Sequence, residues 1–187
     1  MGVPHTSLKG RLLLDGGKLG GGCFQRTVVL VCEHDRQGAF GLVLNRPSEN
    51  SLAEVFSQEL PERLRIETLF GGGPVQPAAM SYLHADQFLG EPSVIENLQV
   101  GHDLERLIEL GASWSPDLRL RVFAGYAGWS PGQLDDEMRR NSWLSVPATL
   151  DLVFHTPADD LWRHVLRHLS DWQSRLLADS PEDLSWN

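Results

Sequence analysis

Short apolar runs and alternating apolar and polar residues divide much of the chain into predicted strands. The run Arg26–Cys32 is continuous and rich in β-branched residues, which is typical of a strand buried on both faces. The polar segment Glu33–Gly38 ends in glycine and predicts a hairpin turn leading into Ala39–Leu44. Leu118–Ala124 alternates strictly, as a half-buried strand does. Further strands are predicted at Leu8–Leu14, Ile66–Phe70, Met80–His84, Val94–Leu98 and Leu150–Phe154.

Helical spacing of apolar residues predicts helices between and after these strands. In the segment Asp103–Leu110 the leucines share one face, and Gly111 is placed to end the helix. A longer helix is expected after Thr156, which can cap it, with Pro157 at the first helical position. Its predicted apolar face consists of Leu161, Trp162, Val165, Leu166 and Leu169. Shorter helices are predicted at Ser51–Phe56 and Pro131–Arg140.

Together these elements predict an α+β fold. Hairpin-like neighbouring strands with few helices between them favour a mainly antiparallel sheet with covering helices over a doubly wound sheet. The 187 residues suit one domain, and the sequence contains no linker that would divide it. We therefore expect a single domain over residues 1–187, with loosely ordered ends at 1–7 and 180–187.

Charge and composition narrow the possible functions. A net charge of −9 argues against direct nucleic-acid binding, which requires clustered basic residues. The longest apolar stretches are about six residues, whereas a membrane-spanning helix needs roughly 20, so no membrane partner is predicted. The N-terminus has no apolar segment typical of a secretion signal. The two cysteines, Cys23 and Cys32, suggest reduced thiols and a cytoplasmic protein.

The segment Gly128–Gly132 matches the G-x-S-x-G pattern of a nucleophile elbow and lies between a predicted strand and a predicted helix. A hydrolase that uses Ser130 with His155 or His34 is therefore one alternative. However, the residue after the serine normally supplies an oxyanion-hole N–H, and Pro131 has none. Ser130 followed by Gln133 also forms a capping-box pattern. We favour a helix cap and predict no catalytic residue.

Other motifs that suggest a cofactor or a metal are incomplete. The glycine-rich segment Asp15–Gly22 lacks the Gly-Lys-Ser/Thr of a phosphate loop and leads into a strand. His164 and His168 have helical i, i+4 spacing but no intervening glutamate of a zinc-protease motif. Residues of Cys32–Asp35 alternate between strand faces and so converge poorly on one ion. The sequence therefore predicts neither a cofactor nor a metal site.

Several short motifs occur in order along nearly the whole chain, at Leu8–Leu13, Phe24–Val29, Cys32–Asp35, Gly41–Pro47, Gly72–Val75, Gly125–Trp129, Pro131–Leu134, Val153–Phe154 and Leu161–Trp162. Together they resemble the uncharacterised bacterial YqgE/AlgH family. The resemblance implies a compact α+β domain with a mainly antiparallel sheet and supplies no activity. Some members are described as candidate transcriptional regulators linked to alginate production. The sequence has no helix-turn-helix signature that would support direct DNA reading.

The motif residues cluster at predicted strand ends and turns, where binding residues commonly lie. We therefore expect a non-catalytic binding or regulatory module, with a small anionic ligand or a protein as its partner. If the turns meet, Arg46 would anchor an anion, Tyr126 and Trp129 would form walls, and glycine amides would donate hydrogen bonds. A third alternative is a protein-interaction partner of a regulator. The candidate ligand-binding residues are His34, Asn45, Arg46, Gly72, Gly73, Tyr126, Trp129 and Gln133.

Overall fold

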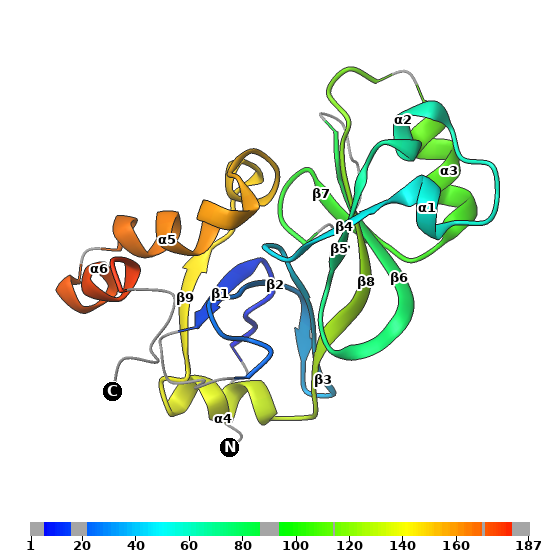
Figure 1. Ribbon diagram of the computed structural model, residues 1–187. Helices are drawn as coiled ribbons and strands as arrows, with labels where there is room; N and C mark the ends of the chain where they lie inside the picture. The colour runs from blue at the N-terminus through cyan, green and yellow to red at the C-terminus, as the bar shows by residue number, and fades with distance from the viewer. Residues whose placement is uncertain (1–5, 16–21, 87–93, 114, 170, 181–187) are drawn as a thin grey trace.

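The computed structural model describes residues 6–15, 22–86, 94–113, 115–169 and 171–180 (Figure 1). Within these ranges, nine strands join in one sheet in the order β4-β5-β8-β3-β2-β1-β9, and β6 pairs with both β7 and β8. All of their pairings are antiparallel except that of β5 with β8. The strands are β1 (Arg11–Asp15), β2 (Val28–Asp35), β3 (Gly38–Val43), β4 (Pro47–Ser51), β5 (Thr68–Gly71), β6 (Val75–Ala85), β7 (Leu98–Gly101), β8 (Arg119–Trp129) and β9 (Trp143–Pro147).

Helices gather at three places around this sheet. The helices are α1 (Leu52–Val55), α2 (Glu62–Arg65), α3 (Leu104–Ala112), α4 (Gln133–Arg139), α5 (Ala158–His168) and α6 (Trp172–Ala178), with a π-helical turn η1 at Asp151–His155. In Figure 1, α1, α2 and α3 lie together at one end, α5 and α6 lie on the side of β9 and β1, and α4 lies at the bottom, beneath β1 and β2. The predicted fold class is confirmed: the chain is an α+β domain with a mainly antiparallel sheet.

The long strand β8 connects the two halves of the sheet. Its first part, Arg119–Tyr126, pairs with β6, and Val122–Ala124 also pairs with β5 on the other edge. Its last residues, Ala127–Trp129, pair instead with β3. Because β3 continues into β2, β1 and β9, β8 holds both sets of neighbours in one sheet.

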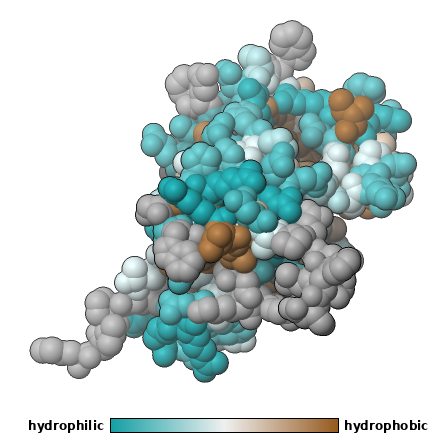
Figure 2. Space-filling view, turned by 60° about the vertical axis from the view of Figure 1, so that its left-hand side comes forward, coloured by the Kyte–Doolittle hydropathy of each residue, from teal (hydrophilic) through white to brown (hydrophobic). Residues whose placement is uncertain are grey.

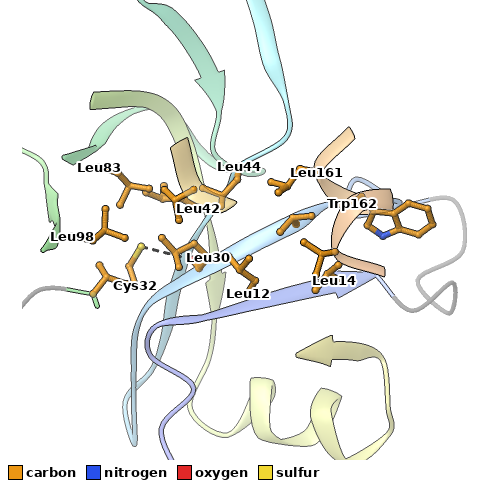
Figure 3. Packing of buried hydrophobic residues seen from close by; sticks show 14 of the residues in the cluster. Leu12, Leu14, Leu30, Cys32, Leu42, Leu44, Leu83, Leu98, Leu161 and Trp162 are labelled. Atoms are coloured by element: carbon orange, nitrogen blue, oxygen red, sulfur yellow. Dashed lines mark hydrogen bonds between the residues drawn. The ribbon is translucent and has the colours of Figure 1, made fainter. Parts of the chain in front are cut away.

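Side-chain alternation explains why β1 and β2 are buried on both faces. Leu12, Leu14 and Leu30 point toward α5 and join its Leu161 and Trp162 in the largest apolar cluster (Figure 3). The intervening residues of β1 and β2, such as Leu13, Val29 and Val31, point to the opposite face and pack beneath α4. The continuous apolar run in the sequence therefore reflects a strand covered by a helix on each side.

A third apolar cluster joins α1, α2 and α3 to the other half of the sheet. Leu52, Leu64 and Leu107 are fully buried there against Val122 of β8. Gly111 lies inside α3, which ends at Ala112, so the prediction that this glycine ends the helix is wrong. A Cβ at Gly111 would come within 2.4 Å of the Leu64 side chain. The glycine therefore permits close packing of α3 against α2.

The structure corrects the predicted strand Leu150–Phe154, since Asp151–His155 forms a π-helical turn with Val153 buried. A short apolar run does not distinguish a buried strand from a buried helical turn. The strand lies earlier, at β9, where each residue pairs with one of β1. Most of the predicted strand Val94–Leu98 is a turn around Asn97, whose φ is 59°, and β7 begins only at Leu98.

The two cysteines occupy contrasting environments, which can be tested chemically. Cys23 is exposed, whereas Cys32 of β2 is buried in the apolar cluster under α5, and burial raises the pKa of its thiol well above the ordinary value. We expect a small disulfide reagent such as DTNB to titrate one thiol in the native protein and two in denaturant. Rapid reaction of both thiols in the native protein would contradict this burial.

Candidate functional site

The predicted site residues do not converge on one cleft, and the geometry of β8 explains why. Trp129 packs with Ala127 in the cluster beneath α4. Tyr126 lies on the opposite face of the strand, where its ring stacks 5.1 Å from that of Phe40. Residues separated by an odd number of positions point to opposite faces of a strand. The prediction that Tyr126 and Trp129 form two walls of one cleft is therefore wrong.

His34 lies on the side of the sheet that carries α4. Its side chain is buried, with Nδ1 accepting a hydrogen bond from the backbone N–H of Leu8 at 3.0 Å. Its Nε2 lies 3.7 Å from a carboxylate oxygen of Asp135 on α4. The His34 carbonyl also accepts a bond from the Ser7 hydroxyl at 2.8 Å. His34 therefore fastens the segment before β1 to the end of β2.

The segment between β8 and α4 differs in detail from the predicted cap. The side chain of Gln133 accepts a bond from the Ser130 N–H at 3.0 Å, as in the glutamine half of a capping box. The helix, however, begins at Gln133, and its N-cap is Gly132 rather than Ser130. Gly132 has a φ of 74°, a left-handed conformation that glycine adopts without strain. Pro131 and Gly132 form the turn that delays the helix.

Glu137 organises this region, although the sequence analysis did not identify it. Its carboxylate accepts hydrogen bonds from the indole N–H groups of Trp129 and Trp143 at 2.9 and 2.7 Å. The other carboxylate oxygen accepts a bond from Gln133 at 2.9 Å. Because Trp143 starts a strand that the sequence did not predict, the pattern gave no reason to place the two indoles together. Trp129 therefore has a structural role, as an indole held by α4.

Gly72 and Gly73 lie where the chain crosses the backbone of β8. The N–H of Gly72 donates to the Ala124 carbonyl at 2.8 Å, so this amide is not available to a ligand. A Cβ on Gly72 would come within 2.3 Å of the Gly125 carbonyl oxygen, and one on Gly73 within 2.2 Å of the Tyr126 carbonyl carbon. These glycines allow two backbones to pack closely. The Gly72 amide therefore does not have the predicted role of donating a hydrogen bond to an anion.

Asn45 and Arg46 follow β3 and lie at a different end of the sheet. The buried Asn45 side chain accepts a bond from the Val28 N–H at 2.8 Å and donates to the Arg26 carbonyl at 2.9 Å. The Arg46 guanidinium donates to the carbonyls of Gln25 and Asn45 at 2.6 and 3.4 Å. Among the described residues, Arg46 has no carboxylate partner. Its positive charge therefore stays uncompensated by a direct ion pair.

Asn45 and Arg46 line a cavity of about 760 Å³. One wall comes from the ends of strands and carries Arg26 and Arg46; the other is the first half of α5, with Asp159, Trp162 and Arg163. Among the described lining residues, three arginines against one aspartate give a positive balance in a chain of net charge −9. We call this feature the arginine cavity; its remaining lining residues are Gly22, Cys23 and Gln25.

The arginines of the cavity are held in place by neighbouring groups. The guanidinium of Arg26 lies 5.1 Å from the centre of the Trp162 ring, and its Nη2 donates to the carbonyl and hydroxyl of Ser180 at 3.0 Å each. Arg163 donates from Nε to the Ala178 carbonyl at 3.2 Å. Cationic groups fixed in this way are suited to receive an anion with little loss of side-chain entropy.

A further arginine, Arg121, bonds to the backbone next to Asn45. Arg121 of β8 donates to the Leu44 carbonyl at 3.2 Å and lies 4.5 Å from the centre of the Phe70 ring. Burial lowers the pKa of Arg121 to about 10, so it remains charged at neutral pH. Burial also raises the pKa of the nearby Glu67 carboxyl, an effect that Arg63 and Arg121 partly oppose. This guanidinium fixes the backbone immediately before Asn45.

The groups proposed for a hydrolase are not assembled around Ser130. His155 lies 3.3 Å from Asp151 and 3.5 Å from Arg119. No hydrogen bond joins Ser130 to a histidine in the part of the chain that the structure describes. A different serine, Ser81, lies 3.0 Å from Nδ1 of His102, but it is almost completely buried within β6.

The histidine pair on α5 forms a local contact, consistent with its helical spacing. The rings of His164 and His168 lie 4.4 Å apart, and Nδ1 of His168 is 2.7 Å from the His164 carbonyl oxygen. Among the described residues, no three histidine, cysteine, aspartate or glutamate side chains come together in a way that could hold a metal ion. The same residues include no helix long and apolar enough to span a membrane.

The fold and the site define the class of this protein as an α+β domain with a mixed sheet and an arginine-lined cavity. The model of a protein family described as AlgH-like matches residues 12–173, so the chain belongs to the AlgH-like family. A UPF0301 protein of Xanthomonas campestris is 36% identical over 172 residues, which cover 87% of this chain and 89% of that protein. A UPF0301 protein of Mycobacterium marinum is 35% identical over 184 residues, covering 95% of this chain and 90% of that protein.

Two solved structures share the fold. The solution structure of the AlgH protein from Pseudomonas aeruginosa matches with a TM-score of 0.73 and 29% identity, covering 97% of this chain and all of that one. The crystal structure of protein DIP2367 from Corynebacterium diphtheriae matches with a TM-score of 0.73 and 23% identity, covering 95% of this chain and 94% of that chain. The predicted resemblance to the YqgE/AlgH family is confirmed.

Replacing Glu137 tests whether its carboxylate holds α4 to the sheet. Glu137→Leu leaves two largely buried indole N–H groups without their acceptor, and each unsatisfied donor costs about 1–3 kcal/mol. We expect the free energy of unfolding to fall by about 2–4 kcal/mol, measured by urea denaturation. Glu137→Gln is the control, because its carbonyl oxygen still accepts from an indole. Equal stability of Glu137→Leu and the wild type would contradict this role.

Ser130 can be tested as a nucleophile with an active-site probe. Because its backbone N–H is bonded to Gln133 and Pro131 offers no oxyanion donor, we expect no labelling by a fluorophosphonate. Intact-protein mass spectrometry of the wild type and of Ser130→Ala would measure any adduct. An adduct on the wild type that Ser130→Ala lacks would restore the hydrolase alternative.

Proposed function

We propose that the chain is a non-catalytic cytoplasmic module that binds a small anion in the arginine cavity and serves a regulatory role. The observation that carries the proposal is the part of the lining that the structure describes, with three guanidinium groups and one carboxylate around about 760 Å³. Ligand pockets commonly enclose about 300–1,000 Å³. Of the residues expected from the sequence, Asn45 and Arg46 contribute to this cavity.

The charge pattern supports an anion as the ligand. Arginine offers planar, bidentate donors that match carboxylate and phosphate oxygens. The described hydrogen bonds of Arg46 end on neutral carbonyl groups, which leave its positive charge to attract a ligand. The surface turned toward the viewer in Figure 2 is mainly hydrophilic in its described part, with small separate apolar patches.

Support for a binding role over catalysis comes from the roles of the other motif residues. Gly72, Trp129 and Gln133 make contacts that hold the fold, and His34 fastens the N-terminal segment. The cavity brings cationic groups together without a neighbouring serine–histidine pair among its lining residues. A cavity with this lining can hold an anion, and the bound anion can change the residues around the cavity.

Substitution of Arg46 tests the anion site. We expect inorganic pyrophosphate to bind the wild-type protein in calorimetry, and Arg46→Ala to weaken that binding about tenfold, since a charge-assisted hydrogen bond contributes about 1.5–3 kcal/mol. Arg46 is exposed and its bonds end on carbonyls, so the variant should keep its fold.

Arg65→Ala is the matched control, since Arg65 is an exposed arginine on α2 that lies 3.9 Å from Glu62 and does not line the cavity. The control should bind pyrophosphate as the wild type does. Absence of pyrophosphate binding to the wild type, or equal losses in both variants, would overturn the proposal.

A further inference from the structure

Two of the arginines that line the arginine cavity also hold helix α6. Arg26 donates from Nη2 to the carbonyl and the hydroxyl oxygen of Ser180, at 3.0 Å each. Arg163 donates from Nε to the Ala178 carbonyl at 3.2 Å. These acceptors lie at the C-terminal end of α6, where the partial negative charge of a helix favours nearby cations. The cavity and the end of α6 therefore share two guanidinium groups.

The bonds to Ser180 engage the nitrogen of Arg26 that an anion would use. A carboxylate or phosphate binds a guanidinium best through two parallel N–H bonds, donated by Nη2 together with either Nη1 or Nε. Both arrangements include Nη2, so an anion that binds Arg26 in this way competes with Ser180. The anion adds its own charge to the attraction, whereas the carbonyl and hydroxyl groups of Ser180 are neutral.

Helix α6 depends on such polar bonds because its own packing is limited. It lies beside α5 (Figure 1), with Ala178 buried and Leu177 partly buried in the main apolar cluster. Leu176, in contrast, is 62% exposed. A helix of seven residues is well below the length that is stable alone in water. Loss of the Arg26 bonds would therefore shift α6 toward an undocked state.

Resting on the proposed function, we infer that α6 responds to the occupancy of the arginine cavity: a small anion bound there takes Arg26 from Ser180 and releases α6 from α5. The end of α6 is thus an internal competitor for the anion. The coupling is reciprocal, so a change that weakens the docking of α6 strengthens anion binding. The filled and the unfilled cavity then differ in the surface that the domain presents to a partner.

Hydrogen exchange of the full chain, measured by mass spectrometry, tests the release of α6. We expect saturating inorganic pyrophosphate to speed amide exchange in α6 at least about threefold, relative to sodium chloride at equal ionic strength. At a pyrophosphate concentration equal to the wild-type Kd, Arg46→Ala should show a much smaller change, because it binds more weakly. An equal change in Arg46→Ala would place the effect outside the cavity and overturn the inference.

Arg167 offers a second test, in which charge alone and the release of α6 predict opposite results. Arg167 of α5 holds α6 through Asp179, with Nη2 2.8 Å from Oδ1, and is not among the described lining residues of the cavity. Arg167→Gln removes a positive charge, which by itself would weaken pyrophosphate binding. It also loosens α6, so we expect binding about two- to fivefold tighter, the effect of an exposed ion pair. Arg65→Gln is the matched control for loss of charge and should bind as the wild type does.

The proposed function and the release of α6 fail in different ways. If pyrophosphate binds the wild type but leaves exchange in α6 unchanged or slower, the cavity is an anion site and the inferred release is wrong. Binding to Arg167→Gln that is no tighter than to the wild type contradicts the release in the same way. If pyrophosphate does not bind the wild type, the proposed function fails together with the inference. Circular dichroism of each variant checks that the fold is retained.

Discussion

The close passage of two backbones at β8 is the constraint on which the rest of the structure depends. Gly72 and Gly73 pack against Gly125 and Tyr126 at distances that exclude a side chain. At this point β8 leaves β5 and takes β3 as its neighbour, and the carbonyl of Gly72 accepts a bond from Val43 of β3. The crossing therefore joins the half of the sheet covered by α1, α2 and α3 to the half covered by α4 and α5. Without it, the three apolar clusters would have no common sheet.

In the half of the sheet covered by α4 and α5, the two faces serve different purposes. On one face, α4 is held by the Glu137 carboxylate between two indoles, and this arrangement uses residues that looked like binding groups in the sequence. On the other face, α5 packs over β1 and β2, and its first half faces the strand ends. The arginine cavity lies at this boundary between helix and strands. Its cations are thus positioned by the packing of the main apolar cluster.

The sequence predicted the fold class and most strands because side-chain alternation depends only on which faces are buried. It misplaced Leu150–Phe154 and missed β9, since a short apolar run fits a helical turn as well as a strand and Trp143–Pro147 is recognisable only beside β1. Of the predicted candidate residues, Asn45 and Arg46 line the arginine cavity, and they are neighbours in the sequence; their binding role stays a prediction. Arg26 and Arg163 were not among the predicted residues, because their place in the same cavity depends on the docking of α5, which no local pattern encodes.

Asn45 separates the stability of this region from its chemistry. Its side chain takes the place of a backbone partner, accepting from Val28 and donating to Arg26, so both halves of the amide are needed. Aspartate lacks the donor and leucine lacks both groups, and either would leave buried polar atoms unpaired. Arg46, one residue later, is exposed, and its side chain does not replace a backbone partner in the sheet. Replacement of Arg46 can therefore change the charge of this edge, while the neighbouring Asn45 amide keeps the strands paired.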